Sequence, residues 1–548
     1  MNLSYRVLVL ILLSVCFSDV NAGEILIKIN KNYINLPVSQ AQERKKMTFE
    51  VDGKQERYFV IRLADSNPQY WVFADVSALK GKTLKISYEG DPVGLKKIYQ
   101  SNEIEGQNDI YREENRPQFH FTSKRGWIND PNGLIYYEGE YHLFYQHNPF
   151  ESEWENMSWG HAVSKDMLHW KELPTALSPD ALGTMFSGST VIDYENTAGF
   201  NKGGVPAMVA TYTVASPDRQ IQCVAYSLDK GRTWTKYAKN PIIDSKEKWN
   251  SVDTRDPRVF WFAPGRHWVL VLNERDGHSI YNSSNLKDWK YQSHTTGFWE
   301  CPDLFELAVD GDQSNKKWVM YGASNTYMIG SFDGKKFTPE LGKYYYTTGT
   351  IYAAQTFTNI PQSDGRRIQI GWGRVNHKGM PFNGMMLLPT ELKLKSTKDG
   401  IRLFSEPVKE VHALFESVNT NSNLTSDAAN QILTQYDLAN PLRLKAKIKL
   451  SHATSAGLSL DGQKVLDYDM NFNLVNGVFY SPKDMTSMTI EAEIYIDKTS
   501  VEVFIDNGAY SYSLQRNPDK KNSDRLKFWG NNITVENLEI FTGTSIWR

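Results

Sequence analysis

Apolar and polar residues alternate along most of the chain, and amphipathic helical spacing is scarce. Ile25, Ile27 and Ile29 alternate with other residues near the start, and Gly, Pro, Asn and Asp separate short apolar runs throughout. A period of two, punctuated in this way, is typical of half-buried strands joined by turns. The pattern therefore predicts an all-β protein.

The first block of this pattern covers residues 23–112. Its apolar runs Tyr58–Ile61 and Tyr70–Phe73 predict buried strands, and no cluster of catalytic residue types stands out in it. We expect a small N-terminal β-sandwich-like domain that packs on or extends the main domain, with carbohydrate binding as the alternative. The charged stretch from Glu103 to Pro117 is predicted to be a linker.

The second block, residues 118–405, repeats one unit. Its second strands are apolar runs that follow one another about every 50 to 65 residues, namely His142–Tyr145, Met208–Tyr212, Trp268–Leu272, Trp318–Tyr321 and Ile368–Trp372. After each of the first four comes a Ser, a short polar turn and an aromatic residue, from Ser164 to Trp170, Ser227 to Trp234, Ser284 to Trp289 and Ser331 to Phe337. Five copies predict a five-bladed β-propeller. A long β-sandwich with coincidental spacing is the alternative.

The third block, residues 408–548, is predicted to form a C-terminal β-sandwich. Strands are expected at Leu442–Leu450 and at Ser500–Ile505, where alternate apolar residues share one face. The Asp506–Gly508 triplet that follows is a strong hairpin turn signal.

Three carboxylates stand within two residues of a proline, each just before an apolar strand of the repeat. They are Asp130, Asp256 and Glu300, and each opens a predicted blade. Any one alone would be read as an ordinary turn or a solvated side chain. Because equivalent ends of inner strands converge at one mouth of a propeller, their recurrence predicts one shared site.

A pair of carboxylates suits the cleavage of glycosidic bonds. That reaction needs an acid to protonate the leaving oxygen and a second carboxylate on the opposite face of the sugar. The two must differ in protonation. Arg255 would favour the ionised form of Asp256 if its guanidinium turns inward, and the rings of Phe298 and Trp299 would raise the pKa of Glu300 if they desolvate it.

The segments around these carboxylates resemble the signatures of glycoside hydrolase family 32, the invertase, inulinase, levanase and fructan hydrolase family. The matching runs, in the order of that family, are Trp127–Gly133, Tyr145–Pro149, Phe186–Ser189, Arg255–Pro257, Trp299–Pro302 and, in the C-terminal block, Val501–Phe504. The resemblance covers residues 118–548. Ile128, where the family often has Met, is a conservative departure.

The resemblance implies a retaining mechanism on a five-bladed propeller, with a role for each carboxylate. Asp130 would be the nucleophile, Glu300 the acid and base, and Asp256 the stabiliser that holds two fructose hydroxyls. The site for the terminal fructose would be lined by Asn129, Gln146, Trp154, Phe186, Ser187, Arg255 and Trp372.

Composition and charge limit the classes of binding partner that we expect for this protein. With 61 basic and 63 acidic residues, the net charge of -2 gives no reason to expect nucleic acid or an anionic membrane as a partner. No cofactor and no metal are predicted, because the scattered His142, His147, His161 and His169 read as surface or turn residues. Cys301 is expected to be a buried neighbour of Glu300 rather than a nucleophile. We expect a monomer.

Residues 1–22 are typical of a signal peptide. Arg6 precedes an uncharged, mostly apolar run from Val7 to Ser18, and small residues end at Ala22. Cleavage before Cys16 with lipidation is the alternative. After cleavage at Ala22 only Cys223 and Cys301 remain, so no disulfide framework is expected. The protein is predicted to be exported, to the periplasm, the cell surface or the medium, as in gut-type Gram-negative bacteria.

The resemblance implies that the substrate is a fructan, levan or inulin, from which fructose would be released at chain ends. Hydrolysis of sucrose and short fructo-oligosaccharides and endo-cleavage are the alternatives within the family. A fructosyltransferase and a non-catalytic fructan-binding protein are the more distant alternatives.

Overall fold

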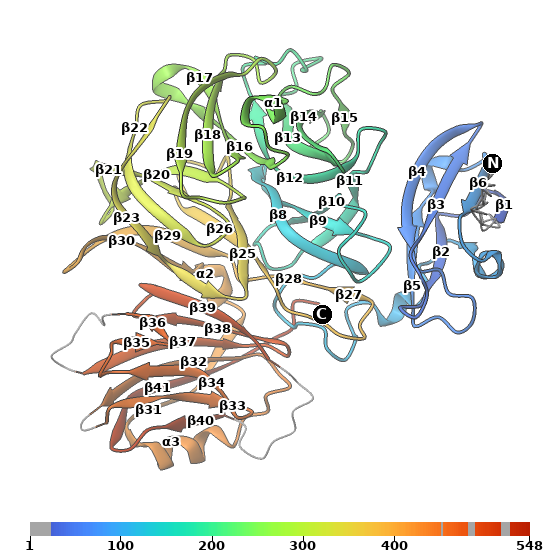
Figure 1. Cartoon of the computed structure of the whole chain (residues 1–548). Coiled ribbons are helices and arrows are strands. Elements are labelled where there is room, and N and C mark those ends of the chain that lie inside the picture. The colour runs from blue at the N-terminus through green and yellow to red at the C-terminus, as the bar shows by residue number, and fades with distance from the viewer. Residues whose placement is uncertain (1–22, 451–452, 481–487, 517–525, 548) are drawn as a thin grey trace, which may run out of the picture.

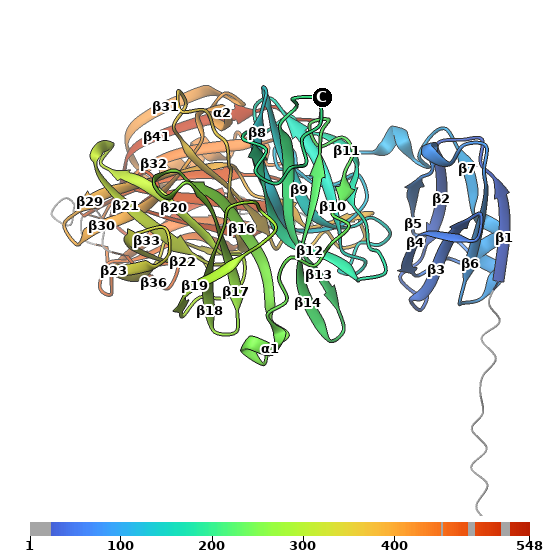
Figure 2. The same ribbon diagram turned by 90° about the horizontal axis from the view of Figure 1, so that it is seen from above.

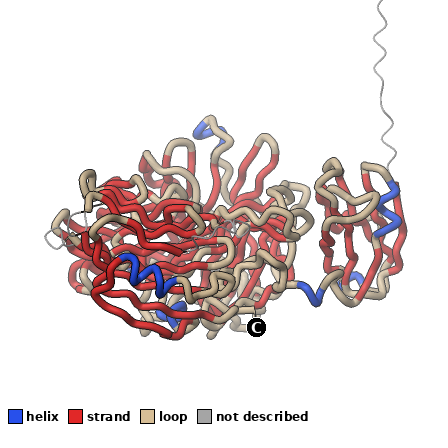
Figure 3. The backbone as a smooth tube through the Cα atoms, turned by 90° about the horizontal axis from the view of Figure 1, so that it is seen from below, coloured by secondary structure: helices blue, strands red, loops and turns tan. Residues whose placement is uncertain are grey.

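The computed structural model describes residues 23–450, 453–480, 488–516 and 526–547. Strands dominate these ranges and helices are short (Figures 1 and 3), which confirms the all-β prediction. The predicted signal peptide and Cys16 lie outside the described residues. Within those ranges, we find no helix with both the length and the apolar character needed to cross a bilayer.

Two small sheets build the N-terminal domain, which stands at the side of the main body (Figures 1 and 2). The first has the order β1 (Gly23–Lys28), β6 (Thr83–Tyr88), β3 (Lys45–Val51), β4 (Lys54–Ile61). The second has the order β5 (Tyr70–Asp75), β2 (Tyr33–Val38), β7 (Tyr99–Ser101). Alternate residues such as Leu36, Phe49 and Phe59 pack between them. Strands thus occur at both runs predicted from the sequence.

Five four-stranded antiparallel blades follow, which confirms the propeller and excludes the single long sandwich. Blade 1 is β8 (Gly126–Tyr137), β9 (Glu140–Asn148), β10 (Ser158–Ser164), β11 (Lys171–Leu177); blade 2 is β12 (Thr184–Asp193), β13 (Ala207–Ser216), β14 (Arg219–Ser227), β15 (Thr235–Lys236); blade 3 is β16 (Thr254–Phe262), β17 (His267–Glu274), β18 (Gly277–Ser283), β19 (Lys290–Thr296); blade 4 is β20 (Asp303–Val309), β21 (Asp312–Tyr321), β22 (Thr326–Phe332), β23 (Phe337–Tyr345); blade 5 is β25 (Ile351–Thr356), β26 (Arg367–Gly373), β29 (Thr390–Thr397), β30 (Gly400–Pro407). All five predicted runs lie in second strands.

A ring of side-chain bonds joins the first strands of the blades. Thr190 on β12 donates to the carbonyl of Gly133 on β8, and Ser189 donates to that of Pro257 on β16. The ring continues from β16 to β20, from β20 to β25 and back to β8 through Arg258–Asp303 (2.9 Å), Thr356–Asp303 (2.9 Å) and Gln355–Leu134 (3.0 Å). These side-chain bonds cross from blade to blade, which fixes the inner strands relative to one another.

The first three Ser-to-aromatic turns of the repeat share one geometry. The hydroxyls of Ser164 and Ser227 bond the Asp two residues on, and in the third copy Ser283 bonds Asn285. The aromatic residue then donates its indole N–H to a carbonyl of the turn, as Trp170, Trp234 and Trp289 do. The third turn thus begins at Ser283, not at Ser284 as the sequence pattern had indicated.

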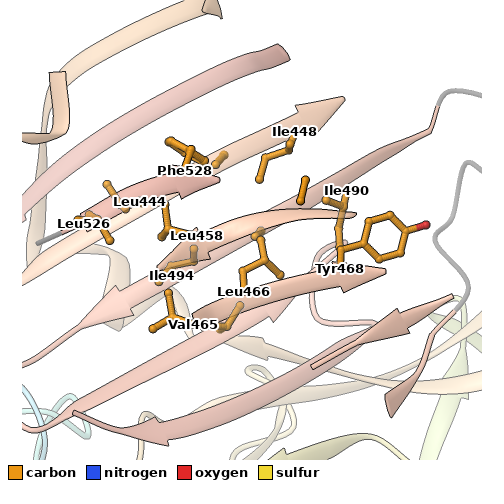
Figure 4. Close-up of a cluster of buried hydrophobic side chains, with 14 of the residues drawn as sticks. Leu444, Ile448, Leu458, Val465, Leu466, Tyr468, Ile490, Ile494, Leu526 and Phe528 are labelled. Carbon is orange, nitrogen blue, oxygen red and sulfur yellow. The ribbon is translucent and has the colours of Figure 1, made fainter. Parts of the chain in front are cut away.

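The C-terminal sandwich packs two sheets over one core, of which Figure 4 shows a part. One sheet has the order β24 (Thr347–Gly349), β39 (Tyr510–Gln515), β38 (Ser500–Ile505), β37 (Thr489–Ile496), β32 (Leu442–Leu450), β41 (Ile533–Gly543), β31 (Phe415–Thr425); the other has the order β36 (Val478–Phe479), β35 (Leu474–Val475), β34 (Gln463–Asp469), β33 (Ser455–Leu460), β40 (Leu526–Trp529). Both strands expected here have the predicted bounds.

The remaining described elements are short connections. They are β27 (Phe382–Asn383), β28 (Met385–Met386), α1 (Lys246–Trp249), α2 (Lys409–His412), α3 (Ser426–Leu433), η1 (Ser77–Leu79), η2 (Pro92–Lys97), η3 (Gln107–Asp109) and η4 (Ala263–Gly265). Strand β27 pairs in parallel with the start of β8, which ties the chain after β26 back to blade 1.

The segment predicted to be a linker is packed against the main body. Arg116 is fully buried, donates to Thr122 Oγ1 (2.6 Å) and lies 3.4 Å from the ring centre of Phe382. Tyr111 stacks on Trp547 with ring centres 4.0 Å apart. Charged residues such as Arg116 here make specific buried contacts, which composition alone did not distinguish from solvation.

Candidate active site

Irregular backbone at the starts of the inner strands aims the three carboxylates. The β8–β9 pairing shifts register between Ile128 and Pro131, and the β16–β17 pairing shifts between Arg255 and Arg258. Asp256, Glu300 and Cys301 have φ of 65°, 52° and 40°. Bulges and left-handed residues turn a side chain out of its strand's alternation, and such strain is characteristic of functional sites.

The three carboxylates meet around Cys301. Its sulfur lies 3.6 Å from Asp130 Oδ2 and 3.6 Å from Asp256 Oδ2, and its backbone N–H donates to Asp256 Oδ2 at 3.0 Å. Glu300 is the preceding residue. The spatial convergence that the sequence predicted is therefore present, from three blades at one mouth of the propeller.

Asp130 is held by short hydrogen bonds. Ser187 Oγ donates to its Oδ2 at 2.7 Å and Asn129 Nδ2 donates to its Oδ1 at 3.1 Å. Burial raises the pKa of Asp130; these two donors oppose that effect, and the charge of Glu300 adds to it. The carboxylate is thus fixed in orientation beside other acids.

Asp256 is buried beside two other acids and a guanidinium. Burial raises the pKa of Asp256 to about 7, Arg255 opposes the shift, and the charges of Glu300 and Asp130 add to it. The guanidinium is 4.0 Å from Asp256 but 2.7 Å from Glu300. Arg255 therefore favours the ionised form of Asp256, as expected, but its guanidinium turns toward Glu300 and the effect of burial prevails.

Glu300 is bound on both of its oxygens. Arg255 donates to Oε1 at 2.7 Å, and the Tyr352 hydroxyl donates to Oε2. The neighbouring rings are engaged elsewhere, since Phe298 stacks on His278 and Trp299 lies beneath the Arg255 guanidinium. Tyr352, on β25, was missed by sequence reasoning because no carboxylate–proline pattern marks the fifth blade; the shift in β25–β26 pairing beside it is visible only in three dimensions.

Two further predicted residues present free donors at this mouth. Gln146 lies on β9 across from the β8 irregularity that contains Asp130, and Trp372 packs edge-on against Trp127 and near Tyr352. Within the described part of the chain, Gln146 Nε2 and Trp372 Nε1 have no hydrogen-bond partner. Buried donors of this kind are suited to bind ligand hydroxyls.

The remaining predicted residues form one side of the mouth. Ser187 contacts Asp130, and Phe186 precedes it on β12. Trp154 packs edge-on against Phe186 at 6.2 Å and is 48% exposed. The structure therefore brings all ten predicted residues to one region.

The histidines and cysteines differ in part from expectation. His142, His147 and His161 are buried, not surface or turn residues; His142 and His161 bond each other at 3.1 Å. Only His169 is a turn residue, bonded to Asp166. Burial raises the pKa of the Cys301 thiol well above its usual value, which fits a neutral packing residue.

A separate cavity of about 840 Å³ lies at the opposite end of the axis. Residues at the ends of β12 and β16, such as Ile192, Asp193 and Phe262, line it. The three carboxylates are at the starts of their strands and take no part in it. The convergence of acids identifies the candidate active site.

A propeller with a sandwich behind it and paired acids at one mouth defines a glycoside hydrolase. The family model described as "Glycosyl hydrolases family 32 N-terminal domain" matches residues 120–407, and the chain belongs to glycoside hydrolase family 32.

Similar proteins agree with this assignment. The chain is 37% identical to a levanase of Bacillus subtilis, over 80% of this chain and 72% of that one, and 34% identical to an extracellular exo-inulinase of Aspergillus niger, over 80% and 96%. Among solved structures, the exo-inulinase of Aspergillus awamori is similar at TM-score 0.68 and 28% identity, over 80% of this chain and 100% of that one.

Proposed function

We propose that this protein is an exo-acting fructan hydrolase that releases fructose from β-fructofuranosyl chain ends with retention of configuration. One observation carries the proposal: Asp130, Asp256 and Glu300 surround a single point at one mouth of the propeller. Retaining glycosidases need a nucleophilic carboxylate and an acid on opposite sides of the bond that breaks.

The roles are those that the family resemblance implies, and the contacts of each carboxylate support them. Asp130, oriented by Ser187 and Asn129, attacks the anomeric carbon while Glu300 gives its proton to the departing oxygen. Glu300 then takes a proton from water, whose oxygen displaces Asp130 and releases fructose. Asp256 accepts hydrogen bonds from two fructose hydroxyls and stabilises the positive charge of the transition state.

Fructan is the substrate class that the relatives favour. The levanase and the exo-inulinases named above align over most of their own lengths, and an invertase of Saccharomyces cerevisiae is 35% identical over 59% of this chain. Free donors on Gln146 and Trp372 and the exposed Trp154 ring suit a furanose ring with several hydroxyls.

Product analysis over time tests this proposal. Levan, inulin and sucrose are each incubated with the purified protein and sampled early by chromatography. Fructose alone from a fructan supports exo-hydrolysis, whereas a ladder of oligosaccharides means endo-cleavage. Faster turnover of sucrose than of fructans assigns an invertase, growth of chains from sucrose a transferase, and binding without products a fructan-binding protein.

Export rests on the first 22 residues and on the relatives that are named as extracellular. The mature chain would then begin at Gly23, or at a lipidated Cys16, in a Gram-negative host. N-terminal sequencing of the exported protein separates the two. We also propose a monomer, which size-exclusion chromatography with light scattering tests.

A further inference from the structure

The loop between β9 and β10 connects the active site to the N-terminal domain. This loop, residues 149–157, carries Trp154, whose ring packs on Phe186 beside the Ser187–Asp130 hydrogen bond. Phe150, in the same loop, is part of the hydrophobic core of the N-terminal domain and stacks on Phe59 with ring centres 3.6 Å apart. One loop is thus shared by the mouth of the propeller and the core of another domain.

Ion pairs also attach this loop to the N-terminal domain. The carboxylate of Glu151 has no exposed surface and receives Arg44 Nε at 2.8 Å, the backbone N–H of Arg62 at 2.7 Å and Arg62 Nη1 at 3.3 Å. Both arginines also reach Glu153, each at 3.0 Å. Burial raises the pKa of Glu151 and the two arginines oppose that shift. Without them, a buried carboxylate would lack compensation, which is a costly state.

The backbone of the loop is held as well. Asn156 makes two hydrogen bonds with the backbone of Val60 on β4, accepting at 2.8 Å and donating at 2.9 Å. The backbone N–H of Ser152 donates to the Tyr70 hydroxyl, and its carbonyl accepts from Asn383 of the propeller. Contacts on both sides of Trp154 therefore fix the chain, while Trp154 itself leaves about half of its surface to solvent.

We propose that the N-terminal domain is a specificity-determining part of the active site, which it completes by fixing the loop that presents Trp154 to the fructan chain. The inference rests on the proposed function and extends it to a domain that holds none of the three catalytic carboxylates. Arg44 and Arg62 are positioning residues: they contact Glu151, not substrate. A Trp154 ring that is preorganised in this way lowers the entropic cost of binding a sugar ring.

The test is the double substitution Arg44→Ala with Arg62→Ala, compared with Lys85→Ala. Lys85 lies in the same domain and pairs with Glu24 and Glu50, away from the propeller. We expect the double variant to raise KM for fructo-oligosaccharides about five- to tenfold with kcat within about twofold, since coupled contacts are worth about 1 kcal/mol. Lys85→Ala should match the wild type, and Arg44→Lys with Arg62→Lys should recover part of the loss.

Adding Trp154→Ala makes the test specific. If the arginines act through Trp154, the triple variant is no worse in KM than Trp154→Ala alone; additive losses would overturn the proposal. Hydrogen exchange of residues 149–157 gives a readout that needs no turnover. Faster exchange in the double variant, but not in Lys85→Ala, is expected, and equal protection overturns the proposal. A wild type that cleaves no fructan would instead refute the proposed function.

Discussion

At the scale of single residues, the site is a cluster of acids that affect one another's pKa values. Asp130 and Asp256 both have raised pKa values, from burial and from the charge of Glu300. Interacting acids of this kind titrate as a group. Before substrate binds, the two aspartates therefore ionise at higher pH than isolated carboxylates do, and burial raises the pKa of Asp256 to about 7.

Removing the proposed nucleophile tests its role directly. Asp130→Asn keeps the shape of the side chain and its bonding partners Ser187 and Asn129, so the fold should persist. We expect kcat to fall by about 10³-fold or more, since no other group takes the place of an attacking carboxylate. Initial rates on a fructo-oligosaccharide give the measurement, and Asp399→Asn, an exposed turn residue of blade 5, is the control. A variant that kept a tenth of the wild-type rate would remove Asp130 from this role.

The acid cluster also predicts a change in pH dependence. Because the charge of Glu300 raises the pKa of both aspartates, Glu300→Gln should lower them, and Arg255, released from Glu300, should lower them further. The acid limb of kcat/KM, which reports the free enzyme, should move to lower pH.

An aryl fructoside with a good leaving group allows that profile to be measured. Glu300→Gln should harm such a substrate less than it harms sucrose, because a good leaving group needs less protonation. An unmoved acid limb would contradict the coupling, and equal losses on both substrates would argue against Glu300 as the acid.

Sequence identified the acids but not how they are paired. The carboxylate–proline pattern recurs in register with the repeat, so Asp130, Asp256 and Glu300 could be placed at one mouth from spacing alone. The direction of Arg255 and the Tyr352 contact depend on side-chain torsions and on a register shift in β25–β26. Neighbours in sequence are poor guides to electrostatics where the backbone leaves strand geometry.

At the scale of elements, the β38–β39 hairpin illustrates what local sequence determines. Asp506, Asn507 and Gly508 have φ of 47°, 57° and 80°, the left-handed region that the Asp, Asn and Gly of hairpin turns adopt readily. What local sequence does not reveal is that the turn docks on blade 5, where Ser405 N–H donates to the Gly508 carbonyl at 2.9 Å.

Gly508→Ala should therefore destabilise the protein more than a comparable substitution elsewhere. A Cβ at Gly508 would lie 2.3 Å from the Ser405 carbonyl oxygen, and φ is +80°. Gly477 has φ of +79° with no atom near its virtual Cβ, so Gly477→Ala carries the backbone strain without the clash. Strain alone costs about 1–2 kcal/mol. The melting temperature of Gly508→Ala should lie clearly below that of Gly477→Ala. Equal melting temperatures would mean that the contact between the hairpin turn and blade 5 contributes nothing to stability.

At the scale of the whole molecule, one buried histidine links the propeller and the sandwich. His120 Nδ1 contacts Asp497 at 2.8 Å and Nε2 contacts Glu502 at 2.6 Å. Burial alone would lower the pKa of His120, but the two carboxylates raise it to about 9. The three blocks of the chain could be recognised in the sequence. This contact between two of them could not, because His120 and Asp497 are more than 370 positions apart.

The junction predicts a loss of stability in alkali. The folded-state pKa of His120 lies above the ordinary value of 6.5, so its stabilisation is complete below that pH and disappears as pH rises through about 9. The melting temperature of the wild type should fall more between pH 7 and 10 than that of His120→Gln, whose side chain does not titrate. Parallel curves for the two proteins would contradict this prediction.

The strand β24 has a consequence for how the molecule comes apart. It belongs to the connection between the fourth and fifth blades, yet it pairs in parallel with β39, through Thr347–Gly349 and Ser511–Ser513, at the edge of the sandwich sheet. The two bodies thus share a ladder of main-chain hydrogen bonds. Proteolytic cleavage after Pro407 should leave fragments that still migrate together under native conditions, and calorimetry should record them melting as one cooperative unit.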